Sequence, residues 1–223
     1  LSAGCVRSAW RAPNLAPLTP TGTGAQPRAT DRALWLVLPL CATVLLLAVT
    51  NHLCQEVAVV PLLWVVPLAL YLLSFVLPFA SERAYRRAWC LPILILSLVA
   101  LAQATTMGAR VGILLAVPLY GGGLFVACLF CHGELAARRP TTRHLTAYYL
   151  CIAGGGALGG AFVSLLAPLL FRGFDELYVG LLLCAGLATA LAFRDPAFRR
   201  ERGPWQPSLV ALFVVTGVLA LLL

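Results

Sequence analysis

The sequence contains few charged residues and no lysine. Aspartate, glutamate and arginine make up 11% of the 223 residues, whereas a soluble domain has about a quarter charged residues. Hydrophobic residues make up 61%, and the mean hydropathy is +0.93. So little charge cannot cover a water-facing surface, which argues against a soluble globular domain. We therefore expect lipid to surround most of the chain.

The positions of the cysteines and of the basic residues also argue against a disulfide framework and against a nucleic-acid-binding surface. Most of the eight cysteines lie singly inside apolar runs, where they are typical of small buried hydrophobic residues. The net charge of +8 comes entirely from arginine. These arginines form short clusters between apolar runs, which suits membrane orientation, and we expect no nucleic-acid partner.

The apolar runs predict an all-α fold, a polytopic integral membrane helical bundle of six or seven spans. A membrane helix needs about 20 mostly apolar residues, and no run shows the alternation of a β-barrel strand. Seven runs qualify or nearly qualify: 34–51, 57–79, 90–107, 111–131, 145–171, 177–193 and 208–223. Residues 31–223 are predicted to form the transmembrane domain of a protein that is longer at both ends. Residues 1–30, rich in proline and glycine, are predicted to be a flexible linker or loop.

The arginines alternate between the two sides of these runs. The predicted inner side, immediately before the first run and after the second, fourth and sixth, holds twelve arginines: Arg28, Arg32, Arg83, Arg86, Arg87, Arg138, Arg139, Arg143, Arg194, Arg199, Arg200 and Arg202. The opposite loops hold only Arg110 and Arg172. Because basic loops stay in the cytoplasm, the loops 81–89, 132–144 and 194–207 are predicted to be cytoplasmic.

Residues 128–135, CLFCHGEL, contain the C-x-x-C-H pattern that attaches a c-type haem. The arginine bias places Cys128, Cys131 and His132 on the cytoplasmic side, whereas bacteria attach such haem outside the cytoplasm. Two packed helix cysteines are therefore the favoured interpretation, and no cofactor is expected. A metal or redox role stays open, because Cys131, His132 and Glu134 could ligate zinc, although no fourth ligand is apparent.

Polar residues at the span ends are the candidates for function. On the outer side, His52 and Glu56 would stack at i, i+4 if the first helix continues, and Gln55 lies between them. Ionisable residues at membrane depth are costly and often functional. The alternative interpretation is an interfacial turn with ordinary polar caps.

His132 and Glu134 are the candidates on the inner side. Glu134 and Arg138 lie one helical turn apart and can pair. The patch is interpreted either as a helix end whose long side chains reach the interface, or as an anion- or partner-docking surface.

Residues 154–160, GGGALGG, contain two overlapping G-x-x-x-G motifs, Gly155 with Gly159 and Gly156 with Gly160. Missing side chains let two helix backbones approach closely in a membrane. A dinucleotide fingerprint would need a preceding strand, which is absent. We predict close packing of this run against a neighbouring helix.

Three stretches resemble the membrane region of bacterial spermidine-synthase-like fusion proteins: residues 51–75, NHLCQEVAVVPLLWVVPLALYLLSF, residues 131–140, CHGELAARRP, and residues 144–171, HLTAYYLCIAGGGALGGAFVSLLAPLLF. The resemblance covers roughly residues 33–195. In that family a transporter-like bundle precedes an aminopropyltransferase-like soluble domain. It implies a multi-pass protein of the bacterial cytoplasmic (inner) membrane, with the lipid bilayer, the soluble domain and other membrane subunits as partners.

The resemblance assigns no reaction to this chain. The Gly-rich donor loop and the clustered acids of the family's soluble domain do not occur in it, so no catalytic residue is expected. The resemblance implies a membrane module that anchors or serves a polyamine-related domain. The alternatives are a small-molecule or polyamine transporter and a haem or metal redox protein. A polycation carrier should place acids near mid-membrane, whereas Glu56 and Glu134 lie at span ends, which favours the module.

Overall fold

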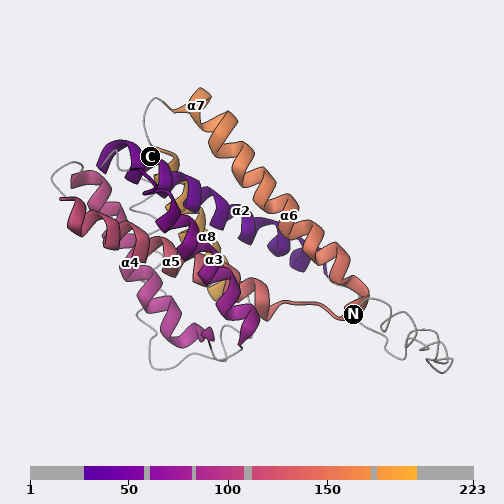
Figure 1. Cartoon of the computed structure of the whole chain (residues 1–223). Helices are drawn as coiled ribbons and strands as arrows, with labels where there is room; N and C mark the ends of the chain where they lie inside the picture. Colours follow the sequence, from indigo (N-terminus) through magenta and orange to yellow (C-terminus); the bar gives the residue numbers. More distant parts are fainter. Residues whose placement is uncertain (1–27, 58–60, 82–83, 108–111, 172–174, 195–223) are drawn as a thin grey trace, which may run out of the picture.

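The structure, a computed structural model, describes residues 28–57, 61–81, 84–107, 112–171 and 175–194. Every regular element in these ranges is helical (Figure 1). The α-helices are α2 Ala29–His52, α3 Val65–Ala80, α4 Arg87–Met107, α5 Ile113–Ala137, α6 Leu145–Ala161, α7 Ala167–Leu170 and α8 Glu176–Arg194. Leu53–Val57 and Phe162–Leu166 are π-helical turns, and Thr142–His144 is a 3₁₀ turn. An all-helical chain suits lipid, because a helix satisfies its own backbone hydrogen bonds.

Within the described residues, five helical segments are long and apolar enough to cross a membrane: Ala29–Gln55, Arg87–Thr106, Ile113–Ala137, Thr142–Leu170 and Glu176–Phe193. The multi-pass helical bundle is therefore confirmed at the level of length and composition. The sixth apolar helix, α3, has 16 residues. At 1.5 Å per residue it is about 24 Å long, shorter than the roughly 30 Å hydrocarbon core. The predicted run 208–223 lies outside the described residues.

The second predicted span, 57–79, starts later in the structure than the sequence predicted. The π-helical turn extends α2 to Val57, and α3 begins only at Val65. Between them Leu62 adopts a φ of 64°, a left-handed conformation that a bulky residue rarely takes and that stops a right-handed helix. Pro67 then falls in the first turn of α3, where a missing N–H is tolerated.

Contacts between helix ends show that the arginine-bearing ends lie together. The indole of Trp35, near the start of α2, donates to the carbonyl of Arg138, just after α5. The distance between these two atoms is 3.2 Å. At the other end of α2, Asn51 Nδ2 lies 3.5 Å from Glu176 Oε1 at the start of α8. The helices therefore alternate in direction as the arginine pattern requires.

Helix α2 lies at the centre of the bundle and contacts α3, α5, α6 and α8 (Figure 1). Its buried face includes Leu38, Cys41 and Leu45, none of which is exposed. Large apolar side chains point outward elsewhere, including Leu114 on α5, 92% exposed, and Leu169 on α7, 84% exposed. Such side chains would be costly in water and are suited to lipid.

The α2–α6 contact depends on two of the four glycines of the predicted motif. A Cβ on Gly155 would collide with the backbone carbonyl of Leu36, and one on Gly159 would lie 2.7 Å from the carbonyl oxygen of Leu40. A Cβ on Gly156 would make only an ordinary contact of 3.5 Å with Thr43. At Gly160 it would meet nothing within 4 Å. The close approach therefore uses the Gly155 and Gly159 register.

Candidate functional site

The C-H-G-E-L stretch, residues 131–135, forms part of the last two turns of α5. All five residues are buried. Successive helix residues point about 100° apart, so each side chain reaches a different neighbour. The contacts of Glu134, Gly133, His132 and Cys131 differ in chemistry, and together they define the candidate functional site.

The carboxylate of Glu134 is completely buried and is held by three side chains. Arg87 donates through Nε to Oε1 at 2.7 Å and through Nη2 to Oε2 at 3.1 Å. Tyr85 donates its hydroxyl to Oε1 at 2.6 Å. Arg138 pairs with Oε2 and also donates to the backbone carbonyl of Glu134 at 3.0 Å. This network ties the start of α4 to the end of α5.

The i, i+4 pair between Glu134 and Arg138 is present, as the sequence predicted. Tyr85 and Arg87 were not identified from the sequence as partners of Glu134, because they come from the α3–α4 connection and the start of α4. The arginine side chains are each 11% exposed, so the two positive charges lie close to a buried carboxylate with little water around them. Such charges need mutual compensation to be tolerated.

Gly133 makes room for the Tyr85 ring. A Cβ at this position would overlap the ring atoms of Tyr85. Burial, and after it the negative charge of Glu134, raises the pKa of the Tyr85 phenol well above its ordinary value of 10.0. Tyr85 therefore stays protonated and remains a hydrogen-bond donor to the carboxylate throughout the physiological pH range.

We expect Tyr85→Phe to lower the unfolding free energy by about 1.5–3 kcal/mol, the range for a hydrogen bond to a charged group. The raised pKa means that this contribution is complete below the unfolded pKa of about 10 and declines as pH rises further. Unfolding of both proteins in mixed micelles at pH 8 and pH 10.5 checks this. A difference in unfolding free energy between the parent and Tyr85→Phe that is larger at pH 10.5 than at pH 8 would contradict the hydrogen bond from a protonated Tyr85 to Glu134.

His132 is buried, with 1% exposure, and faces α3. Its Nδ1 lies 3.1 Å from Ser74 Oγ, and its ring packs edge-on against Tyr71 and Phe75 at centroid distances of 5.0 and 5.1 Å. Ser74 donates its one hydroxyl proton to the Tyr71 carbonyl at 2.7 Å. Nδ1 of His132 must therefore carry the proton that bonds to Ser74. Its Nε2 has no hydrogen-bond partner among the described residues.

The zinc set considered from the sequence, Cys131, His132 and Glu134, is not brought together. Glu134 is engaged by two arginines, His132 turns toward Ser74, and Cys131 points to α2 and α8. A haem on His132 would have to displace the packed rings of Tyr71 and Phe75. Cys128 and Cys131 are both completely buried, so the packing also favours two helix cysteines over thioether attachment.

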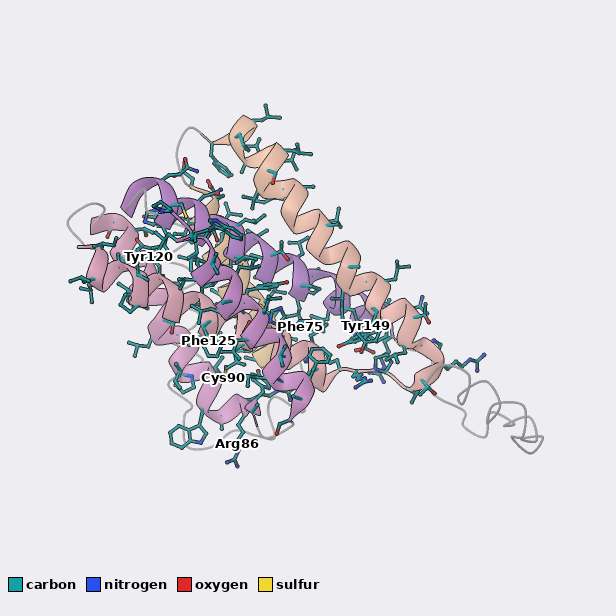
Figure 2. All side chains as sticks on the ribbon, in the orientation of Figure 1. Phe75, Arg86, Cys90, Tyr120, Phe125 and Tyr149 are labelled. Carbon is teal, nitrogen blue, oxygen red and sulfur yellow. The ribbon has the colours of Figure 1, made fainter. Side chains whose placement is uncertain are left out.

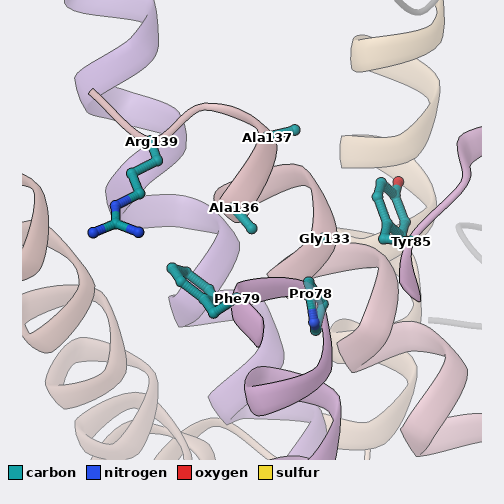
Figure 3. A pocket seen from close by; sticks show the side chains of 7 residues that line it. All are labelled: Pro78, Phe79, Tyr85, Gly133, Ala136, Ala137 and Arg139. Atoms are coloured by element: carbon teal, nitrogen blue, oxygen red, sulfur yellow. The ribbon is translucent and has the colours of Figure 1, made fainter. Parts of the chain in front are cut away.

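A cavity of about 480 Å³ opens beside the Glu134 network. It is lined by Pro78, Phe79, Tyr85, Gly133, Ala136, Ala137 and Arg139. Figure 3 shows Phe79 and Arg139 on one side of the cavity and Tyr85 on the other. The charged group on the lining is a guanidinium, so the cavity is suited to an anionic or neutral polar group rather than to a polycation.

A second cavity, of about 340 Å³, shares Tyr85 with the first. Its lining includes Arg86, Cys90 and Phe125, which are labelled in Figure 2. Most of its other lining residues are apolar. Tyr85 thus lines both cavities, and an arginine contributes to each, Arg139 to the first and Arg86 to the second.

The outer-side candidates lie far from this network. His52 is buried, and its Nε2 lies 2.8 Å from the hydroxyl of Tyr120 on α5. Gln55 is exposed in the π-helical turn. The side chain of Glu56 lies outside the described part of the structure, so the stacking of His52 on Glu56 stays a prediction. The polar candidates therefore form two separate groups, and Tyr120 is a partner that the sequence did not indicate.

Comparison with known proteins adds no relative to this picture. No family profile, curated protein or solved structure matches the chain.

Proposed function

We propose that this chain is the integral membrane module of a spermidine-synthase-like protein, and that its arginine-bearing end seats a polyamine-related soluble domain in the cytoplasm. The Glu134 network is the observation that carries the proposal. It ties Tyr85 and the start of α4 to the end of α5, which restrains the surface at this end of the bundle. A rigid surface can dock a domain with little loss of conformational entropy.

Charged groups remain available at this end for a partner. Arg86, Arg139 and Arg143 are exposed and make no ion pair among the described residues. Exposed arginines are suited to carboxylates on a docking surface, because the guanidinium can bind a carboxylate with two parallel hydrogen bonds. The docking contact should accordingly weaken as salt increases.

The same network speaks against transport of a polyamine through this end. Glu134 is the buried acid next to the larger cavity, and its charge is already compensated by Arg87 and Arg138. A polycation approaching the cavity would meet Arg139 instead. The resemblance of residues 51–75, 131–140 and 144–171 to the synthase-like fusions favours the module further, and with it six or seven spans in a bacterial inner membrane.

Docking can be tested with the complete protein, into which a protease cleavage site is introduced between the membrane part and the soluble part. We expect the cut soluble domain to sediment with membranes at low ionic strength. It should be released in about 1 M salt, where the Debye length falls to about 3 Å. Arg86→Gln, Arg139→Gln and Arg143→Gln combined should release it at low salt, whereas Arg110→Gln, in a predicted outer loop, should not.

Three results would overturn the proposal. The first is a complete protein that contains no synthase-like domain. The second is a cut domain that leaves the membrane regardless of salt and of the three substitutions. The third is uptake of labelled spermidine into vesicles that contain residues 1–223 alone, which would establish the transporter.

A further inference from the structure

Three cysteine side chains from three different helices meet inside the bundle. Cys41 lies near the middle of α2, Cys184 near the middle of α8, and Cys131 in the C-terminal part of α5. Their Sγ atoms all lie within 4.8 Å of one another, and none of the three residues is exposed.

The spacing fits a metal ion bound by three sulfurs. A metal–sulfur bond is about 2.3 Å long, so three sulfurs around one ion in a plane lie about 4.0 Å apart. Sulfur atoms within 4.8 Å of one another reach this arrangement by side-chain adjustments of less than 1 Å. Helix packing provides the convergence, since α2 contacts both α5 and α8.

The donor set indicates which ion. Within the described residues, ligand atoms of three or more histidine, cysteine, aspartate or glutamate side chains come together at these thiols. The group contains sulfur donors and no oxygen or nitrogen donor. Soft sulfur ligands favour Cu(I), Zn²⁺ and iron–sulfur clusters, whereas Mg²⁺, Ca²⁺ and Mn²⁺ prefer oxygen. The surroundings are apolar, because the three cysteines belong to the buried hydrophobic core of the bundle, together with Ala42, Ala185 and Ala188.

We propose that Cys41, Cys131 and Cys184 bind one Cu(I) ion within the membrane bundle. The cysteines bind Cu⁺ as thiolates, so the three thiols release their protons as the ion enters. Zn²⁺ also takes sulfur ligands but is almost always four-coordinate in structural sites, whereas this group offers three ligands among the described residues.

Cys128 is a neighbour of this site and not one of its ligands. It lies one helical turn before Cys131 on α5, and its Sγ is 3.7 Å from the carbonyl oxygen of Ala42, next to Cys41. That weak S–H donation orients the Cys128 thiol toward the backbone of α2. The C-x-x-C spacing therefore marks one ligand and one supporting thiol, in place of a haem attachment.

The test is a titration of the full chain in detergent, reduced and without oxygen, with tetrakis(acetonitrile)copper(I) against the chelator bathocuproine disulfonate. We expect one tightly bound equivalent. Cys131→Ser and Cys41→Ser should each weaken binding by at least about 100-fold, since loss of supporting groups alone costs 10–100-fold. Cys151→Ser, which removes a thiol of α6, is the matched control and should bind as the parent does.

X-ray absorption at the copper edge and thermal unfolding keep the test independent of how the variants fold. The parent should show a first shell of sulfur alone at about 2.3 Å, and Cu(I) should raise its melting temperature by mass action. A first shell containing oxygen or nitrogen would overturn the site. So would equal affinity in all four proteins, or a disulfide between any two of the three cysteines in protein whose thiols were alkylated at lysis.

Discussion

Glu134→Gln is expected to lower the unfolding free energy by about 3–5 kcal/mol, because it leaves two partly buried arginines without their counter-ion. Glutamine keeps the size of the side chain, so lost packing does not explain the effect. It can still accept one or two hydrogen bonds, but it cannot balance the charges of Arg87 and Arg138. Unfolding by sodium dodecyl sulfate in mixed micelles measures the change.

Arg86→Gln is the matched control for this variant. Arg86 directly precedes Arg87, is exposed, and makes no ion pair among the described residues. We expect its removal to change the unfolding free energy by less than about 0.5 kcal/mol, as for other surface sites. Equal effects of Glu134→Gln and Arg86→Gln would show that the network does not stabilise the arginine-bearing end of the bundle.

Alanine substitutions of Gly155 and Gly160, which belong to the two different G-x-x-x-G registers of α6, should change the unfolding free energy in opposite directions. Gly155→Ala places a Cβ against the Leu36 carbonyl, which cannot move without separating α2 from α6. Overpacking of this kind costs about 1–3 kcal/mol. Gly160→Ala meets open space and should stabilise α6 by about 0.5–1 kcal/mol, because alanine is the better helix former.

The same unfolding assay checks this pair, and a larger side chain sharpens it. Gly159→Leu should weaken the α2–α6 contact more than Gly155→Ala does, because leucine adds three further carbons to a Cβ that already lies 2.7 Å from the Leu40 carbonyl oxygen. Lipid cannot fully replace the lost van der Waals contact. If Gly155→Ala, Gly159→Leu and Gly160→Ala all unfold as the parent does, the glycines are incidental to the packing.

Sequence periodicity and charge were sufficient for the coarse architecture. Long apolar runs specify membrane helices because lipid leaves the backbone no other partner, and the arginine clusters specify the direction of each helix. The start of α3 could not be predicted, since it depends on the left-handed conformation of Leu62, which no rule for leucine indicates. The i, i+4 partner of Glu134 was visible because it lies on the same helix.

The remaining partners depend on how the helices are rotated against each other. Tyr85 and Arg87 are separated from Glu134 by 49 and 47 residues, and Cys41 belongs to a different helix from Cys131. Helix rotation is set by the packing of all neighbours together, which periodicity does not contain. The two glycine registers are likewise equivalent in sequence, and only the position of the α2 backbone distinguishes Gly155 from Gly156.

The orientation of the bundle in the membrane decides whether the arginine-bearing end can meet a cytoplasmic domain at all. Alkaline phosphatase, which is active only outside the cytoplasm, can be fused after Arg139 and, as the matched site at the opposite end, after Met107. We predict an inactive enzyme after Arg139 and an active one after Met107. Activity after Arg139 together with inactivity after Met107 would place the Glu134 network outside the cell and contradict the proposed docking function.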